Sequence, residues 1–267
     1  MKKRYLIITI LLLQFFVLNS IELKAENSNN EEKYCPDPAI TALIASNPAI
    51  IEEKIRIAMS KVLNNPATLT IDITYKDDVS TTLGMFERVL VKTSRGNIEG
   101  LILDKADVEF LNIQIDTKEL IEKEDLEPVK MNDIFMNVTI KEEDLNTFLT
   151  AKSKSIKVNK PNINLRKNVM ELSGSTKYGI LRADFFASGN LSVKNKQEIW
   201  FHSNLIKLNR MVMPRSFVGL LIKKINPVLN LKSFPFKLNL KSINILPGII
   251  EFTSEREENG KLSRNNQ

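Results

Sequence analysis

The segment GILRADFFASGNLSVKN, residues 179–195, alternates apolar and polar side chains over nearly its whole length. In a β-strand successive side chains point to opposite faces, so this alternation predicts a strand with one apolar face and Phe186 as the exception. The positions on the apolar face are Leu181, Ala183, Phe185, Ala187, Gly189, Leu191 and Val193. At about 3.3 Å per residue the 13 residues from Leu181 to Val193 would span roughly 43 Å, far more than an ordinary strand of about five or six residues. The small residues among them leave room for a helix or a ligand on that face.

Partner strands for this segment follow it in the chain. Residues 197–209, QEIWFHSNLIKLN, supply a neighbouring strand after a short turn, and residues 235–254 supply two more. In the first of the two strands predicted within residues 235–254, the apolar side chains change from even-numbered positions (Phe236, Leu238, Leu240) to odd-numbered ones (Ile243, Ile245). A parity change predicts a β-bulge, here near Lys241 and Ser242.

The earlier half of the chain has the same alternation. Runs between residues 67 and 116 alternate, and SRGN at 94–97 is typical of a turn between them. Residues 131–149 begin as a strand and continue as a helix, with Thr139 and Glu142 spaced as a capping box. The helix has an apolar stripe of Leu145, Phe148 and Leu149.

Residues 37–65 instead show helical spacing and predict an amphipathic segment with one buried face. Asp37 and Asn47 each precede a proline, as helix N-caps do, and Asn65-Pro66 ends the pattern. The predicted buried positions are Ile51, Ile55, Met59 and Val62.

An unusually apolar run lies close to the C-terminus: FVGLLIKKINPVLNLKSFPF, residues 217–236. Residues 216–226 are predicted to form a helix of about three turns. Its apolar arc of roughly 200° is wider than one packing contact requires. The arc holds Phe217, Val218, Leu220, Leu221, Ile222 and Ile225, and Arg215, Gly219, Lys223 and Asn226 lie opposite.

Two interpretations of this helix stay open on periodicity alone. It is either wedged in the core between the sheet and other elements, or it lines a lipid cavity or a membrane surface. In the second case the cations near it, including Lys224 within the apolar arc, would meet anionic headgroups.

The chain also carries a family resemblance. NVTIKEEDLNTFL at 137–149, then a pair of long strands, then INPVLNLKSFPFKLNLKSINILPGIIEF at 225–252, occur in this order. Order and motifs resemble the LmeA-like phospholipid-binding family of bacterial envelope proteins, over roughly residues 84–254.

This resemblance implies a tubular lipid-binding type of architecture. The expected fold is α+β, a long, strongly curved antiparallel β-sheet wrapped around one or two amphipathic helices, with an apolar groove between them. Phospholipid is then the expected ligand, and no cofactor or metal is expected. The residues expected to contact lipid tails are Phe217, Leu220, Leu221, Ile225, Phe234 and Phe236. Those expected to face headgroups or a membrane are Arg215, Lys223 and Lys224.

The chain start predicts export. Residues 1–25 have a basic head, an apolar stretch and an ending in Ala25, as in a secretory signal peptide; an uncleaved anchor is the alternative. Residues 26–36 are predicted to be a disordered linker, residues 66–254 the lipid-binding domain and residues 255–267 a disordered tail. The expected location is the periplasm or cell envelope, with peripheral membrane contact.

Composition argues against other function classes. Loss of residues 1–25 would lower the net charge from 38 − 32 = +6 to 34 − 31 = +3, which weakens any case for nucleic-acid binding. Cys35 and His202 are the single cysteine and histidine, too few for a typical zinc site, and a Ser-His-Asp or Cys-His system would have to use His202. His202 is predicted to lie at a surface or rim, and the protein is not expected to be an enzyme. The remaining rival is an envelope protein-interaction module with a closed core and no lipid.

Overall fold

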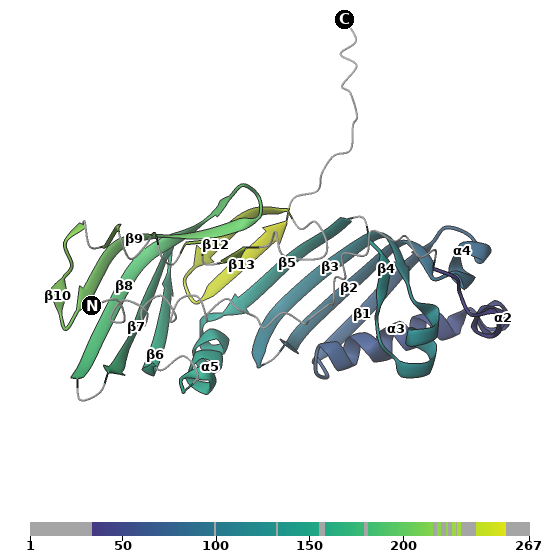
Figure 1. Ribbon diagram of the computed structural model, residues 1–267, viewed down its shortest axis with the longest axis horizontal. Helices are drawn as coiled ribbons and strands as arrows, with labels where there is room; N and C mark the ends of the chain where they lie inside the picture. The colour runs from purple at the N-terminus through teal and green to yellow at the C-terminus, as the bar shows by residue number, and fades with distance from the viewer. Residues whose placement is uncertain are drawn as a thin grey trace, which may run out of the picture.

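The strands of the computed structural model form two antiparallel sheets, which lie one after the other along an elongated molecule (Figure 1). The structure describes residues 34–98, 100–131, 133–154, 158–178, 181–215, 218–219, 223, 226–227, 229–230 and 239–254. This part is a mixed α+β structure, and neither sheet is closed. The single long sheet expected from the sequence is therefore two, because helix α5 (Glu142–Lys152) separates β5 from β6.

The first sheet has the strand order β1-β2-β3-β5-β13-β12, with β4 beside β3. Its strands are β1 (Thr68–Tyr75), β2 (Met85–Ile98), β3 (Leu101–Ile115), β4 (Pro128–Lys130), β5 (Asp133–Lys141), β12 (Leu240–Leu246) and β13 (Ile249–Ser254). The predicted passage from strand to helix is confirmed, since α5 begins directly after β5. The predicted bulge is confirmed as well, because the register between β12 and β13 shifts between Leu240 and Ser242.

The second sheet has the order β10-β9-β8-β7-β6, with β11 beside β9. Its strands are β6 (Asn159–Arg166), β7 (Val169–Tyr178), β8 (Leu181–Lys194), β9 (Glu198–Leu208), β10 (Met211–Val212) and β11 (Leu229–Asn230). The long strand predicted first is β8, of 14 residues, and it pairs with β9 as expected.

The predicted turn at SRGN is wrong, because these residues lie inside β2. Ser94 pairs with Lys105 and Gly96 with Leu103, while Arg95 between them has a left-handed backbone with φ 57°. The register is the same on both sides of Arg95, so β2 continues through this residue as one strand. The reversal comes later, at Gly100, whose φ is 96°.

The N-terminal helical segment is two helices, α2 (Pro38–Ser46) and α3 (Ala49–Val62). Asp37 caps α2 as predicted, accepting a hydrogen bond from the Ala39 amide at 2.8 Å. Asn47 does not cap α3, whose N-cap position is Pro48 and has no side-chain cap bond. Val62, which was predicted to be buried, is 46% exposed, and its neighbour Leu63 is buried instead, at 5% exposed.

Two short helices complete the described elements, α4 (Asp78–Thr82) and the π-helical turn η1 (Glu119–Lys123). In the part of the chain that the structure describes, no helix is long and apolar enough to cross a membrane.

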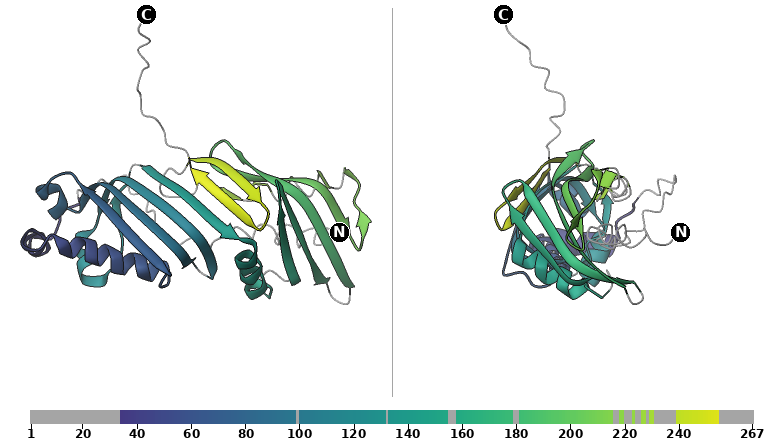
Figure 2. Two further views of the ribbon diagram at one scale, coloured as in Figure 1. Left: turned by 180° about the vertical axis from the view of Figure 1, so that it is seen from behind. Right: turned by 90° about the vertical axis from the view of Figure 1, so that its left-hand side faces the viewer.

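The C-terminal hairpin returns to the first sheet after the whole second sheet has been formed. β13 pairs with β5, from Ile249 opposite Lys141 to Thr253 opposite Asn137. The hairpin lies between the two groups of strands when the molecule is seen from behind (Figure 2, left), and β12 also packs against β6, β7 and β8. The two sheets are therefore joined through β12, β13 and α5.

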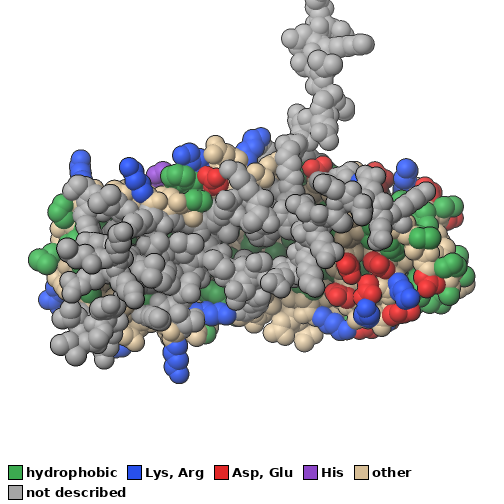
Figure 3. Space-filling view, in the orientation of Figure 1, with side chains coloured by type: hydrophobic (Ala, Val, Ile, Leu, Met, Phe, Trp, Pro, Cys, Tyr) green, Lys and Arg blue, Asp and Glu red, His purple; other side chains and the backbone are tan. Residues whose placement is uncertain are grey.

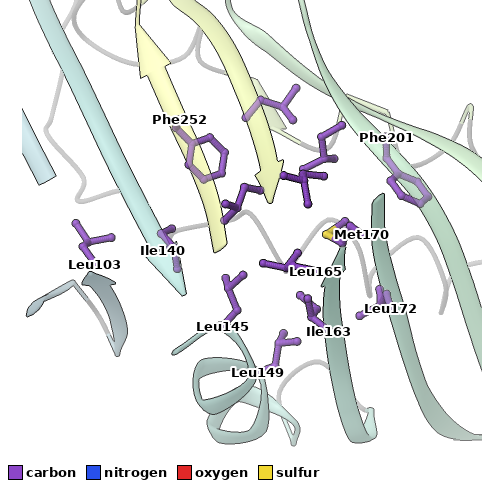
Figure 4. Packing of buried hydrophobic residues seen from close by; sticks show 14 of the residues in the cluster. Leu103, Ile140, Leu145, Leu149, Ile163, Leu165, Met170, Leu172, Phe201 and Phe252 are labelled. Carbon is purple, nitrogen blue, oxygen red and sulfur yellow. The ribbon is translucent and has the colours of Figure 1, made fainter. Parts of the chain in front are cut away.

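Buried apolar side chains form two clusters. One joins α2, α3 and η1 to β1, β2 and β3. The other, here called the central cluster, takes side chains from both sheets and from α5, and Figure 4 shows them converging. Its labelled members are Leu103, Ile140, Leu145, Leu149, Ile163, Leu165, Met170, Leu172, Phe201 and Phe252.

Part of the space beside the small residues of β8 is filled by the sheet's own aromatic side chains. A Cβ on Gly189 would lie 2.7 Å from the Phe201 ring and 2.3 Å from the His202 carbonyl oxygen. Phe201 is 2% exposed, so its ring is buried against this glycine. At Gly189, the bulky group expected from the sequence is thus a neighbouring strand's side chain.

Candidate functional site

The candidate site is the apolar inner face of the second sheet, which turns toward α5 and β12. Directly opposed residues of neighbouring antiparallel strands share a face, and here those residues are apolar on four strands. Each of the following side chains is at most 8% exposed: Ile163, Leu165, Met170, Leu172, Ala187, Leu191, Ile199 and Phe201. The alternation of each strand therefore adds up to one continuous apolar surface.

Helix α5 is attached to the first sheet by an ion pair between a partly exposed arginine and a buried aspartate. Both terminal nitrogens of Arg95 bond the Asp144 carboxylate, at 2.7 and 2.9 Å, and Asp144 is 4% exposed. The Arg95 side chain reaches α5 from a left-handed position within β2, and its hydrogen bond to Asp144 raises the pKa of the guanidinium. Asp104, on β3, lies 2.9 Å from Lys141 and 3.7 Å from Arg95, which extends the pair into a network.

The same helix is attached to the second sheet by hydrogen bonds to the backbone of β6. The Asn146 side chain donates to the Ile163 carbonyl at 2.8 Å and accepts from the Ile163 amide at 2.7 Å. The Glu142 carboxylate accepts from the Leu165 amide at 2.5 Å. The helix thus supplies polar groups that a neighbouring strand would otherwise supply to β6.

The predicted capping box at the start of α5 is wrong for this reason. The N-cap position is Lys141, which makes no side-chain cap bond. Thr139 lies before the helix, in β5, where it pairs with Glu251 of β13. Glu142 reaches β6 instead of the helix start, and Asp144 reaches Arg95. The acids of this turn therefore connect elements; they are not explained by the helix dipole alone.

A second asparagine makes the equivalent contact with β9. The Asn226 side chain accepts from the Phe201 amide at 2.8 Å and donates to the Phe201 carbonyl at 2.9 Å. Three residues later, Leu229 pairs with Ile199 of the same strand. The end of the predicted 216–226 helix is therefore attached to the strand whose Phe201 side chain lines the inner face.

A family model described as LmeA-like phospholipid-binding matches residues 48–255. The chain belongs to the LmeA-like phospholipid-binding family. The match begins within the predicted helical segment, so α3 is part of the LmeA-like pattern, beyond the resemblance seen from residue 84. No curated protein and no solved structure matches the chain.

Most residues predicted to contact lipid in this LmeA-like chain lie outside the described residues. They are Phe217, Leu220, Leu221, Lys224, Ile225, Phe234 and Phe236. Four described residues agree with the faces expected for the predicted helix: Val218 is half-buried, whereas Arg215, Gly219 and Lys223 are exposed. Asn226, also expected opposite the apolar arc, is half-buried. The Val218 amide donates to the Pro214 carbonyl at 3.0 Å, as in a helical turn.

The inner face also carries two hydroxyl groups. The side-chain oxygens of Thr176, on β7, and Ser203, on β9, are buried and have no hydrogen-bond partner among the described residues. Thr176 lies opposite Ala183 and Ser203 opposite Gly189, both inward-facing positions of β8. A buried hydroxyl without a partner loses its hydration, so each would gain from an acceptor brought in by a ligand.

His202 lies on the outer face of the second sheet, where it is exposed. Its Nε2 is 2.7 Å from the Ser192 hydroxyl, and among the residues that the structure describes no carboxylate bonds the ring. Cys35 is an exposed free cysteine. The described ranges also hold no group of three or more His, Cys, Asp or Glu able to bind a metal.

The sequence interpretation missed the three residues that join the elements around the inner face. Arg95 was hidden within a predicted turn, Asn226 was assigned only to a helix end, and Asn146 had no assigned role. A signal existed for the asparagines, since each stands within a motif of the LmeA-like resemblance but outside its apolar stripes. No signal in the sequence pairs Arg95 with Asp144, because they lie 49 residues apart.

Proposed function

We propose that this protein is an exported, non-catalytic phospholipid-binding protein of a bacterial cell envelope that holds acyl chains in an apolar groove. The observation that carries the proposal is the continuous apolar inner face of the second sheet, in a member of a phospholipid-binding family. Removing acyl chain from water contributes about 0.8 kcal/mol per CH₂, so such a groove needs no catalytic group.

In this proposal the second sheet curves around the helix at 216–226, and the segment 217–236 closes the groove. The tails would contact Phe217, Leu220, Leu221, Ile225, Phe234 and Phe236. Arg215, Lys223 and Lys224 would meet the headgroup, and the exposure of the first two agrees with that role. The hydroxyls of Thr176 and Ser203 would donate to ester oxygens of the lipid, which supports a ligand that is apolar with a few acceptors.

Export rests on the signal-like residues 1–25, whether they are cleaved or kept as an anchor. Outside the cytoplasm the protein would meet a membrane surface peripherally to receive or release its lipid. Another envelope protein could present the lipid instead, at an exposed strand edge.

A second candidate function is an envelope protein-interaction module with a closed core. The burial of the Phe201 ring against Gly189 favours it locally, because the chain itself fills that part of the face. This candidate requires that the central cluster be complete without a ligand.

Native and denaturing mass spectrometry separates the two candidates. The exported chain would be purified from an expression host's periplasm without detergent, as the parent and as Leu220→Trp and Leu221→Trp variants. We expect a stoichiometric phospholipid on the parent and its loss from the tryptophan variants, because the larger side chain would occupy the groove.

Leu246→Trp is the matched control, since Leu246 is 37% exposed at the end of β12 and should keep its lipid. A parent that is free of lipid, and stays free after incubation with liposomes, would reject the groove and favour the interaction module.

A further inference from the structure

The two halves of the chain around the sheets carry opposite charge. Residues 34–152, which include most of the first sheet, hold 13 lysines and arginines against 21 aspartates and glutamates, a net charge of −8. Residues 153–230, which include the second sheet, hold 14 basic residues against 3 acidic ones, a net charge of +11. Figure 3 shows acidic side chains gathered toward the α2 and α4 end and basic ones along the opposite half. The net charge therefore changes from negative to positive along the long axis of the molecule.

The β9–β10 hairpin forms the outer end of the basic half (Figure 1). Its two turn residues, Asn209 and Arg210, have φ angles of 49° and 68°, as in the primed turns that close two-residue hairpins. The Asn209 amide donates to the Asp184 carbonyl at 2.8 Å, and the Asp184 amide donates to the Asn209 side chain at 2.9 Å. These bonds fix the turn to β8, so the tip is a defined surface.

This tip exposes two adjacent apolar side chains between cations. Met211 is 65% exposed and Val212 is 62% exposed. Arg210 and Arg215 are exposed on either side of them, and Lys207 lies over the Phe186 ring at 5.6 Å. Single exposed apolar residues are common, but an adjacent pair within a basic end has the composition of a membrane-interface contact.

We propose that the β9–β10 hairpin is the docking site of this protein for a membrane surface that contains anionic phospholipid. Met211 and Val212 enter the headgroup boundary, while Arg210 and its neighbouring cations lie among the anionic headgroups. The negative charge of residues 34–152 is repelled by the same surface, so the molecule docks end-on with α2 and α4 pointing away. This inference rests on the proposed lipid-binding function and adds where, and in which orientation, the lipid is exchanged.

Vesicle flotation of the full exported chain tests the docking site. Phosphatidylglycerol–phosphatidylcholine vesicles would be compared with pure phosphatidylcholine vesicles, at low and high salt. We expect the parent to bind the anionic vesicles at least tenfold more strongly, with the difference falling as salt screens the charges. Equal binding to both vesicle types would overturn the proposal and leave an acidic protein surface as the partner of the basic end.

Tip variants locate the contact. Arg210→Asn removes the charge and keeps a residue that tolerates the left-handed backbone, and it should weaken binding to anionic vesicles about fivefold. Met211→Ser with Val212→Ser should weaken it at least tenfold. Val79→Ser and Lys76→Glu are matched controls at the opposite end, where Val79 is 69% exposed, and should bind as the parent.

Phospholipid carried through purification is measured on the same samples. Tip variants that keep their lipid and lose vesicle binding support the docking site. Tip variants that bind like the parent, or controls that lose as much binding as they do, overturn it. A parent that docks but never carries lipid would reject the proposed function and leave the docking site standing.

Discussion

At the residue scale, two asparagine side chains make the hydrogen bonds to a strand that the backbone of a neighbouring strand would otherwise make. Asn146 bonds both backbone groups of Ile163, and Asn226 bonds both backbone groups of Phe201. An amide side chain carries one acceptor and one donor group, so it can satisfy an N–H and a C=O together. Each asparagine therefore attaches a helical or irregular segment to a sheet without continuing the sheet.

Replacing Asn226 by alanine is expected to destabilise the fold by about 1–3 kcal/mol, because it removes two hydrogen bonds and leaves two half-buried backbone groups without partners. The free energy of unfolding would be measured by urea denaturation of the parent and the variant. Asn190→Ala is the control, since Asn190 is exposed on the outer face of β8. Equal stability of the parent and Asn226→Ala would mean that water replaces the contact at no cost.

At the element scale, the turn η1 is held against helix α3 by charge. Glu124, which follows η1, is 2.9 Å from the Lys54 ammonium and also contacts Lys61. Hydrogen bonds from Lys61 and Lys54 lower the pKa of Glu124 to about 2 from its ordinary value of 4.5. The two lysines stand seven positions apart on α3, so they lie on the same side of the helix and approach one carboxylate.

This contact predicts a specific loss of stability in acid. Because the folded-state pKa is the lower one, Glu124 stabilises the fold fully above about pH 4.5, and its contribution disappears as the pH falls toward 2. Glu124→Gln should therefore be less stable than the parent at pH 7, and the difference should shrink between pH 4.5 and 2.

Thermal unfolding at a series of pH values would measure this difference. Glu53→Gln serves as the control, because Glu53 is exposed on the same helix and has no ion pair among the residues that the structure describes. A parent–variant difference for Glu124→Gln that stays constant over the whole range would refute the role of the ion pairs.

The elements themselves were largely accessible from local patterns. The alternation of apolar and polar residues predicted the length of β8. The change of parity predicted the bulge of β12, and Asp37 before a proline predicted the start of α2. Errors arose where a distant partner overrides a local signal. SRGN has the composition of a turn, but it lies within β2, where Arg95 has a left-handed backbone and bonds Asp144. Glu142 has the spacing of a capping box with Thr139, but its carboxylate bonds the backbone of β6.

At the scale of the whole molecule, the two sheets are joined by a hairpin made last in the chain. Leu240, Ile245, Ile250 and Phe252 contribute to the central cluster, and β13 covers the edge of β5. Backbone contacts continue across the junction: the Asn168 amide donates to the Ile245 carbonyl at 2.8 Å, and the Leu240 amide to the Lys196 carbonyl at 2.7 Å. The two halves should therefore unfold together.

Truncation tests this dependence. A chain ending at residue 238 loses β12 and β13, which exposes the β5 edge and much of the central cluster, and it should be degraded by protease under conditions where the parent is intact. A chain ending at Ser254 keeps both strands and should resist protease like the parent. Equal resistance of the shorter chain would show that the second sheet folds without the hairpin.

Alternation and helical spacing were enough to predict helices, antiparallel strands and an apolar candidate surface, because each depends on the order of side chains along a short segment. The family was predicted by a resemblance of motifs and their order. The division into two sheets, the pairing of β5 with β13 and the contacts of Arg95, Asn146 and Asn226 were beyond such patterns. A strand's periodicity states which face is apolar but not which edge it will meet, since every strand offers the same backbone groups. That choice is made by side-chain packing and hydrogen bonds between residues far apart in the chain, and these exist only once the protein is folded.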